Sequence, residues 1–459
     1  MENRKKTTVD MTEGSIVRHI IMFALPLLGS SMVQQLYNTV DLLYVGNALG
    51  KNAAAAVGAS SMMITCIVGL FGGLSVGCSV AVAKSFGSRD RGGVRRLIST
   101  AAALTLISAV VLTCMGILLA PAFIKAIHSP AEIVSDAVGY LRIYFLSIFF
   151  VISYNMGSGI LRALGNARAT LYAQFFGGLV NVIADGVFVL VLGKGVRGVA
   201  WATLFSQGMA ALLVVWMLMK TDEDIRLRLN DMRIDPVQFR EILRIGIPAG
   251  LQTLLIALSN VIAQYHINSL GTDSITAMTL YIKVELPIYL PIVAMGSAVT
   301  TFVGQNIGAG KRARAHRGTM VCLMMSVILT VMSSALLIVF GRYAFGLFNR
   351  DPSVVALGLR VIRTSFPFYF LYSVLQIFGD SIRGSGNSRG PMLVIMANIT
   401  VFRAVLLSIL VPRYMEIRAA AVTYPLSWFT AAVCMVILYY REKKRMDEAE
   451  LSSGVIKGV

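Results

Sequence analysis

The sequence predicts an all-α polytopic membrane protein with twelve transmembrane helices in two pseudo-symmetric lobes of six helices each. Three observations support this fold. First, 56% of the 459 residues are hydrophobic and only 14% are charged, whereas soluble proteins carry about 25% charged residues. Second, apolar runs of about twenty residues, enough to cross a bilayer, recur along the whole chain. Third, the two halves of the chain resemble one another.

Twelve apolar runs are bounded by charged or turn residues, and each predicts one spanning helix. They lie near 16–47, 53–82, 97–122, 135–157, 168–193, 196–219, 245–270, 274–303, 318–341, 355–379, 391–411 and 418–440. The long polar stretch in the middle separates two sets of six. We therefore divide the chain into a first lobe, a cytoplasmic linker, a second lobe and a cytoplasmic tail, at residues 1–219, 220–244, 245–440 and 441–459.

Lysine and arginine residues predict the orientation of the chain, because they are enriched in cytoplasmic loops. With both termini in the cytoplasm, 28 of the 41 Lys and Arg residues fall in inner segments and 8 in outer loops. This bias explains the net charge of +18 without nucleic acid as a partner. We expect a multi-pass monomer in the lipid bilayer of a cell membrane, with a bacterial inner membrane as the setting.

Short stretches repeat between the halves at a shift of about 221 residues. LRALGNARA (161–169) matches IRGSGNSRG (382–390), and SFGSRDRGGVRR (85–96) matches NIGAGKRARAHR (306–317). Pro26 matches Pro248, and a proline at that point of a helix favours a kink, so Pro26 is a candidate hinge. Parallel repeats of this kind enclose a pathway in transporters; the alternative is a duplication with no transport role.

Several kinds of chemistry find no support in the sequence. There is no GxxxxGK[ST] phosphate-binding loop, so ATP is not expected to be the direct energy source. No Ser-His-Asp or HExxH arrangement can be recognised, and the five cysteines and four histidines are scattered. We expect no enzymatic activity and no cofactor, and we expect an ion gradient or the substrate's own gradient to supply the energy.

Acidic residues inside the apolar runs are the main candidates for a functional site, because a charge within a bilayer is costly. Asn181 and Asp185 lie four residues apart on one face of the fifth span, Asp41 lies in the first span, and Thr203 lies in the sixth. At 1.5 Å per residue, Asp41, Asp185 and Thr203 are each roughly 11 Å below the outer end of their spans.

These four residues predict a cation site in the first lobe. Two carboxylates, an amide and a hydroxyl suit a hard cation such as sodium, with Asp41 and Asp185 as its charged ligands. The same pair could share a proton, because two adjacent carboxylates resist ionising together. The alternative is a pair of acids satisfied by neighbours in a wet cleft, with no transport role.

The second lobe lacks a copy of this cluster but has charges of its own, Lys283, Glu285 and Arg403. Glu285 could pair with Arg403 across helices or contact substrate. In the first span, Gln34 and Tyr37 precede Asp41 and are further candidates for substrate contact. A separate pattern, glycine at every fourth position (Gly69, Gly73 and Gly77), predicts a close-packed face between helices.

The chain resembles the multidrug and toxic compound extrusion (MATE) family over about residues 14–440. The stretches that carry the resemblance are FALPLLGSSMVQQLYNTVDLLYVGNALG, VGQNIGAGKRARAHR, the paired LRALGNA and IRGSGNS, and NVIADGVFV. The resemblance implies a V-shaped pair of six-helix lobes with a central cleft. It also implies alternating-access export of bulky, often cationic and amphipathic organic compounds in exchange for sodium ions or protons.

The resemblance also assigns roles to residues. Asp41 matches the first-span acid of the family, and Asn181, Asp185 and Thr203 match its N-lobe cation site. Some members instead carry acids in the seventh and tenth spans, but here the seventh has none and the tenth has only Asp380, just past its inner end. The alternative function is a flippase for a lipid-linked oligosaccharide or related lipid, which would need a cationic cleft rather than an acidic one.

Overall fold

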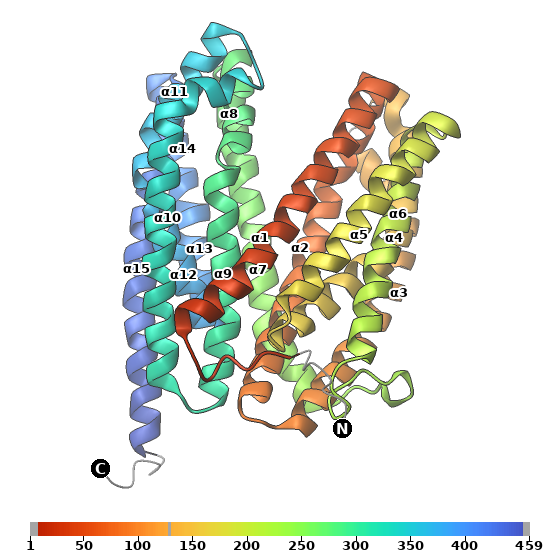
Figure 1. The fold of residues 1–459 in the computed structure, drawn as a ribbon. Helices are drawn as coiled ribbons and strands as arrows, with labels where there is room; N and C mark the ends of the chain where they lie inside the picture. Colours follow the sequence, from red (N-terminus) through yellow and green to blue (C-terminus); the bar gives the residue numbers. More distant parts are fainter. Residues whose placement is uncertain (1–7, 127–129, 453–459) are drawn as a thin grey trace. The chain divides into compact units, whose positions relative to one another are not determined.

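The structure, a computed structural model, describes residues 8–126 and 130–452, and every regular element in these ranges is a helix (Figure 1). The all-helical prediction is confirmed. The helices of the first half are α1 (Ile16–Leu43), α2 (Lys51–Gly87), α3 (Arg91–Ala126), α4 (Ala131–Ala163), α5 (Ala167–Asp185) and α6 (Gly195–Met219). Two π-helical turns, η1 (Tyr44–Leu49) and η2 (Gly186–Val191), continue α1 and α5.

The second half contains more and shorter elements. They are α7 (Pro236–Asn268), α8 (Thr272–Val284), α9 (Leu286–Gly308), α10 (Arg312–Gly346), α11 (Pro352–Ser365), α12 (Phe370–Gly384), α13 (Arg389–Ile395), η5 (Met396–Phe402), α14 (Arg403–Tyr414) and α15 (Ile417–Ser452). The 3₁₀ turns η3 (Leu229–Asp231) and η4 (Phe366–Phe368) complete the described elements.

Twelve spans are present in the described ranges when one bent pair is counted as a single span. Eleven helices are long and apolar enough to cross a membrane, and α11 with α12 forms a twelfth span bent by 51°. The break lies at Tyr369, directly after the 3₁₀ turn η4; η4 contains Pro367, whose ring cannot continue the hydrogen bonding of a helix. The predicted eighth span (274–303) is wrong in its bounds, because the chain breaks at Glu285 and the apolar span is Leu286–Gly308.

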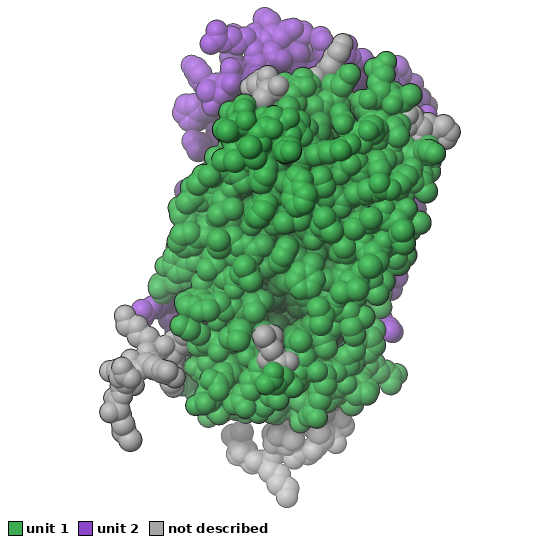
Figure 2. Space-filling view, turned by 90° about the vertical axis from the view of Figure 1, so that its right-hand side faces the viewer, with its two compact units in different colours: residues 1–14, 21–250, 304–311 green, residues 15–20, 251–303, 312–459 purple. Residues whose placement is uncertain are grey.

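Close packing divides the described residues into two units (Figure 2). The first unit contains residues 8–14, 21–250 and 304–311, and the second contains residues 15–20, 251–303 and 312–452. Each unit has apolar cores of its own. Many leucine, valine, isoleucine and methionine side chains remain exposed on outer helices such as α3 and α10, as expected of surfaces that face lipid. The two-lobe division at residues 219 and 245 stays a prediction.

The repeated stretches fold in the same way. Gly165 and Gly386 both adopt positive φ angles, of 85° and 102°, which glycine tolerates and most residues do not. Their backbone N–H groups donate to the carbonyl oxygens of Arg162 and Arg383, over 2.8 and 2.9 Å. The next residue of each copy, Asn166 or Asn387, then accepts a backbone N–H three residues later, over 3.1 Å in both copies. The duplication is therefore preserved in hydrogen bonding as well as in sequence.

The glycine pattern in α2 forms a tight contact with α7 inside the first unit. A Cβ atom built on Gly73 would lie 2.1 Å from the backbone nitrogen of Gly250, and one built on Gly77 would lie 2.4 Å from the carbonyl oxygen of Ile242. Gly246 approaches from the opposite side, with 2.8 Å between its own hypothetical Cβ and the Cα of Leu74. No side chain fits between these backbones, so the close-packed face is confirmed for Gly73 and Gly77.

Candidate functional site

Two polar stripes face each other in the first unit. On α1, Gln34, Tyr37 and Asp41 are spaced three and four residues apart and therefore lie on one face. On α5, the facing stripe begins with Gln174, whose side-chain N–H donates to the Tyr37 hydroxyl over 3.3 Å. About two and three turns further along, α5 presents Asn181 and then Asp185. The first and fifth spans thus run side by side with their polar faces together.

Asp41 meets both predicted partners on α5. Its carboxyl group lies within hydrogen-bonding range of Asn181 and of Asp185. Asp185 has no exposed surface and Asn181 is 1% exposed. The structure therefore brings together three of the four residues predicted to hold a cation.

Several oxygens of the acid pair accept no hydrogen bond. Both carboxylate oxygens of Asp185, one of Asp41 and the amide oxygen of Asn181 are buried and have no partner among the described residues. An ionised carboxylate only accepts hydrogen bonds, so two such groups cannot satisfy one another. Each unsatisfied buried group costs about 1–3 kcal/mol. A proton or a cation between the two acids would remove this cost.

The backbone changes form directly after each acid. The α-helix gives way to π-helical η1 three residues after Asp41 and to π-helical η2 immediately after Asp185, and the two π segments contact each other. Gly186, the first residue of η2, leaves room for Tyr44, whose hydroxyl would lie 3.3 Å from a Cβ at that position. Short π-helical segments are rare and concentrate at functional sites, which supports a functional role for this level of the two helices.

Thr203, on α6, stays a predicted ligand of the cation site. Its hydroxyl donates to the carbonyl of Val199, one turn earlier on α6, over 3.0 Å. Sequence reasoning missed two tyrosines of α4. Tyr140 lies within electrostatic range of both Asp41 and Asp185, and Tyr144 within range of Tyr37. Spacing along the chain could have suggested Gln174, seven residues before Asn181, but the α4 tyrosines depend on how α4 is placed.

A second polar group lies in the second unit, at the break between α8 and α9. Glu285 accepts a hydrogen bond from the hydroxyl of Tyr369 over 3.4 Å, and Tyr281 is also within hydrogen-bonding range. Further rings extend the cluster: Tyr369 and Tyr424 each pack against Trp428, with ring centres 4.8 and 5.9 Å apart. Glu285 therefore lies next to a cluster of aromatic side chains.

The predicted ion pair between Glu285 and Arg403 does not form. Arg403 is 3% exposed; its Nε donates to the Ser427 hydroxyl over 3.0 Å, and its guanidinium lies over the ring of Tyr424, 4.5 Å from the centre. Hydroxyl and ring contacts from α15 take the place of the carboxylate. Glu285 therefore has no ion-pair partner among the described residues.

Asp380 also differs from its predicted position. It lies inside α12 rather than past the end of the span, because the helix continues to Gly384. The Asp380 carboxylate pairs with Arg383 over 2.6 Å and accepts from Gln376 over 2.7 Å. A carboxylate neutralised in this way is a structural ion pair of the second unit and leaves little charge for a coupling ion.

Comparisons with known proteins give a consistent result. The family model MatE matches the chain twice, at residues 26–187 and 248–409. Two relatives from Bacillus subtilis (strain 168) are similar: "Probable multidrug resistance protein YpnP" is 27% identical over 94% of this chain and 96% of its own. "Probable multidrug resistance protein YoeA" is 24% identical over 95% of each chain.

A solved structure shares the fold. It is described as the outward-facing conformation of a multidrug resistance MATE family transporter of the MOP superfamily, and it covers 98% of this chain and 100% of its own with a TM-score of 0.91. The two chains are 23% identical. The two matches of the family model begin at Pro26 and Pro248, the same pair that marks the internal repeat.

Proposed function

Because the chain belongs to the MatE family, the multidrug and toxic compound extrusion transporters, we propose that it exports amphipathic, often cationic organic compounds in exchange for a proton or a sodium ion. The exchange would proceed by alternating access, with the acid pair of the first unit exposed to one side of the membrane at a time. Both termini would lie in the cytoplasm.

The observation that carries this proposal is the acid pair, half-buried Asp41 with fully buried Asp185. Its oxygens are held together without a donor between them, so the pair has a lower free energy when it takes up a small cation. Among the described residues no third His, Cys, Asp or Glu completes a metal-binding group. A site with at most two negative charges favours a proton or a monovalent ion, which binds weakly enough to be released in each cycle.

Binding and release of the cation would change the contacts that α1 makes with α5. Asp41, Tyr37 and Gln34 share one face, so neutralising Asp41 changes what holds that face against α5. Pro26 lies fifteen residues before Asp41 within the same helix, at a point where one backbone hydrogen bond is missing. We propose that α1 bends at Pro26 when the acid pair changes state, and that Gln34 and Tyr37 contact the exported compound.

The aromatic group around Glu285 is the proposed contact in the second unit. Organic cations bind to aromatic faces by cation–π attraction, worth about 0.5–2 kcal/mol according to desolvation, and a carboxylate without a direct basic partner adds charge attraction. The flippase alternative has no comparable support, because the acid pair offers no positive charge to a pyrophosphate group.

Transport driven by an imposed ion gradient tests the function. In proteoliposomes that contain the purified protein, we expect a tenfold sodium gradient at fixed pH, or a one-unit pH gradient in sodium-free buffer, to drive ethidium against its own gradient. A tenfold gradient corresponds to about 1.4 kcal/mol, so one-for-one exchange allows up to about tenfold accumulation. The gradient that drives accumulation identifies the coupling ion.

Protein-free liposomes and liposomes with both gradients collapsed serve as controls. Ethidium movement that only follows its own gradient under every ionic condition would show that the protein is a passive pathway and would end the antiport proposal.

Glu285→Gln is expected to weaken the binding of cationic substrates. The amide keeps the size of the side chain but removes its charge, so we expect the KM for ethidium to rise by about tenfold, equivalent to about 1.4 kcal/mol. Glu416→Gln, a change of the same kind at an exposed position, is the matched control. If both variants keep the wild-type KM, Glu285 does not contact the substrate.

A further inference from the structure

Two neighbouring cavities in the first unit differ sharply in chemical character. The larger, of about 490 Å³, is polar and lies where the start of α3 meets residues 230–235. The smaller, of about 300 Å³, is apolar and lies between α3, α4 and α6. The transport mechanism proposed above uses neither of them.

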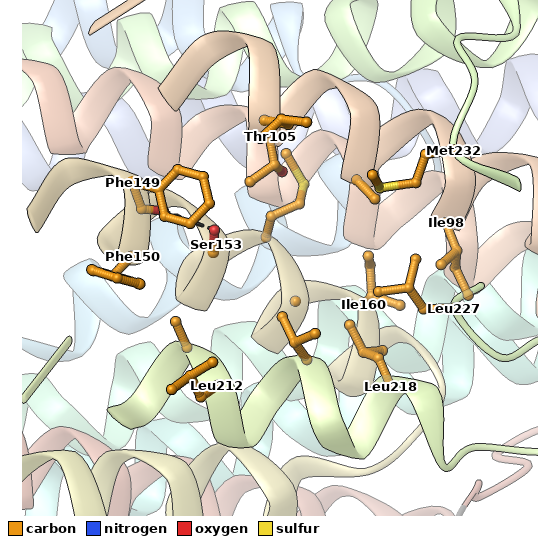
Figure 3. Close-up of a pocket in the computed structure, with 16 residues that line it drawn as sticks. Ile98, Thr105, Phe149, Phe150, Ser153, Ile160, Leu212, Leu218, Leu227 and Met232 are labelled. Carbon is orange, nitrogen blue, oxygen red and sulfur yellow. Dashed lines mark hydrogen bonds between the residues drawn. The ribbon is translucent and has the colours of Figure 1, made fainter. Parts of the chain in front are cut away.

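The apolar cavity presents almost only carbon atoms. Its walls include aromatic and aliphatic side chains at both ends, with Ile98, Leu227 and Met232 near one end and Phe149 and Phe150 near the other (Figure 3). Its two hydroxyl groups are already used, because Thr105 donates to Ala101 and Ser153 donates to Phe149, each over 2.7 Å. The lining of this cavity therefore favours a hydrocarbon chain as its ligand.

The polar cavity carries an excess of positive charge. Arg95, Arg96 and Arg233 line it together with Asp231 and Asp235. Arg95 pairs with Asp231, and Arg96 lies 3.8 Å from Asp235. Arg233 forms no ion pair among the described residues and is the third basic group of the cavity.

Several arginines act on Asp231, one of the two acids of the cavity. The hydrogen bond from Arg95, opposed by slight desolvation and assisted by the charges of Arg95, Arg228 and Arg233, holds the pKa of Asp231 below its usual range. The lining of the cavity therefore has three arginines and two acids. Each guanidinium also has five N–H donors, so the existing ion pairs leave several donors for an anion.

The two cavities are adjacent and are together called the joined cavity. Met232 lines both of them, and the consecutive residues Ile98 and Ser99 of α3 line the apolar and the polar cavity respectively. A ligand that fills both must have an anionic head attached directly to an apolar chain. The cavities lie at the end of α3 that the distribution of lysine and arginine residues predicts to be cytoplasmic, where the membrane surface carries anionic lipids and basic pockets between helices bind their head groups.

We propose that this joined cavity binds one anionic phospholipid of the inner leaflet, with its phosphate between Arg96 and Arg233 and one acyl chain in the apolar cavity. The bound lipid also contacts the segment that follows α6. That segment is attached to α3, because the backbone N–H groups of Arg233 and Asp235 donate to the hydroxyls of Ser99 and Thr100 over 3.0 and 3.1 Å. The lipid is therefore expected to strengthen this attachment.

Native mass spectrometry of the full-length protein tests the proposal. We add dioleoylphosphatidylglycerol, dioleoylphosphatidylcholine or inorganic phosphate to the delipidated protein and count the bound molecules. We expect one phosphatidylglycerol to bind about tenfold more tightly than phosphatidylcholine, since each basic group near an anionic lipid contributes roughly 1 kcal/mol. Inorganic phosphate, which has no chain, is expected not to compete.

Three variants separate a lipid site from ordinary surface charge. Arg233→Gln should reduce phosphatidylglycerol binding about fivefold, and Ala102→Phe, which narrows the apolar cavity, should reduce it without changing the charge. Asp231→Asn removes an acid and should increase binding, although it also removes the partner of Arg95. A purely structural role for these charges predicts no gain in lipid affinity from Asp231→Asn. Arg342→Gln is the control, because Arg342 is an exposed arginine of α10 in the second unit.

The outcomes are decisive in both directions. Equal binding of the two lipids by the wild-type protein, or unchanged phosphatidylglycerol binding in both Arg233→Gln and Ala102→Phe, would overturn the proposal. Competition by inorganic phosphate would show an anion site without a lipid chain and would overturn it as well. Elution of each variant as a single species in size-exclusion chromatography excludes misfolding as the cause of lost binding.

Discussion

Replacing Asp185 by asparagine is expected to abolish coupling between the ion gradient and ethidium transport. The amide cannot release a proton and carries no charge for a sodium ion, so the site keeps a single carboxylate, Asp41. A charged hydrogen-bonding partner contributes about 2 kcal/mol, which corresponds to roughly thirtyfold weaker cation binding. Gradient-driven ethidium accumulation in proteoliposomes measures the effect, and Asp41→Asn should reproduce it.

The same substitution should not destabilise the protein. In the wild type the two acids face each other with several buried oxygens unsatisfied, and an asparagine at position 185 supplies a donor to Asp41. We therefore expect an equal or higher midpoint of thermal unfolding in detergent together with lost coupling. Strained polar groups of this kind are a common cost of a functional site.

Asp136→Asn is the matched control, because Asp136 is an exposed carboxylate of α4 and the change in charge is identical. It should leave both accumulation and stability as they are in the wild type. Gradient-driven accumulation that persists at the wild-type level in both Asp185→Asn and Asp41→Asn would remove the acid pair from the coupling mechanism.

Replacing Gly73 by alanine is expected to disrupt the first unit. The added Cβ would lie 2.1 Å from the nitrogen and 2.3 Å from the Cα of Gly250, and backbone atoms cannot move aside as a flexible side chain can. Overpacking typically costs about 1–3 kcal/mol, and we expect the upper end of that range here because α2 and α7 must separate. The midpoint of thermal unfolding and the yield of monodisperse protein measure the effect.

Gly72 provides a control one residue away in the same helix. A Cβ built on Gly72 meets no atom within 4 Å, and alanine has a higher helix propensity than glycine by about 1 kcal/mol. Gly72→Ala should therefore be neutral or stabilising. If Gly73→Ala unfolds at the same temperature as Gly72→Ala, the contact between α2 and α7 is looser than the structure shows.

The amino-acid sequence by itself was enough to predict the fold class, the number of spans and the existence of two related halves. Lipid requires long apolar helices whose backbone groups are satisfied internally, so spans can be recognised one at a time without knowledge of their neighbours. Spacing within one helix was equally reliable: it placed Asn181 with Asp185 on one face and Gly73 with Gly77 on another.

Only the tertiary structure decided which residues meet across helices. It separated Glu285 from Arg403, turned the hydroxyl of Thr203 back to its own helix, and brought Tyr140 near the acids. It also placed an apolar cavity next to a basic one at Met232. These outcomes depend on the rotation of each helix about its axis and on which helices are neighbours. Packing sets both. Helices with the same hydrophobic period could be rotated or exchanged without changing the pattern of residues along the chain, so the sequence alone does not determine these contacts.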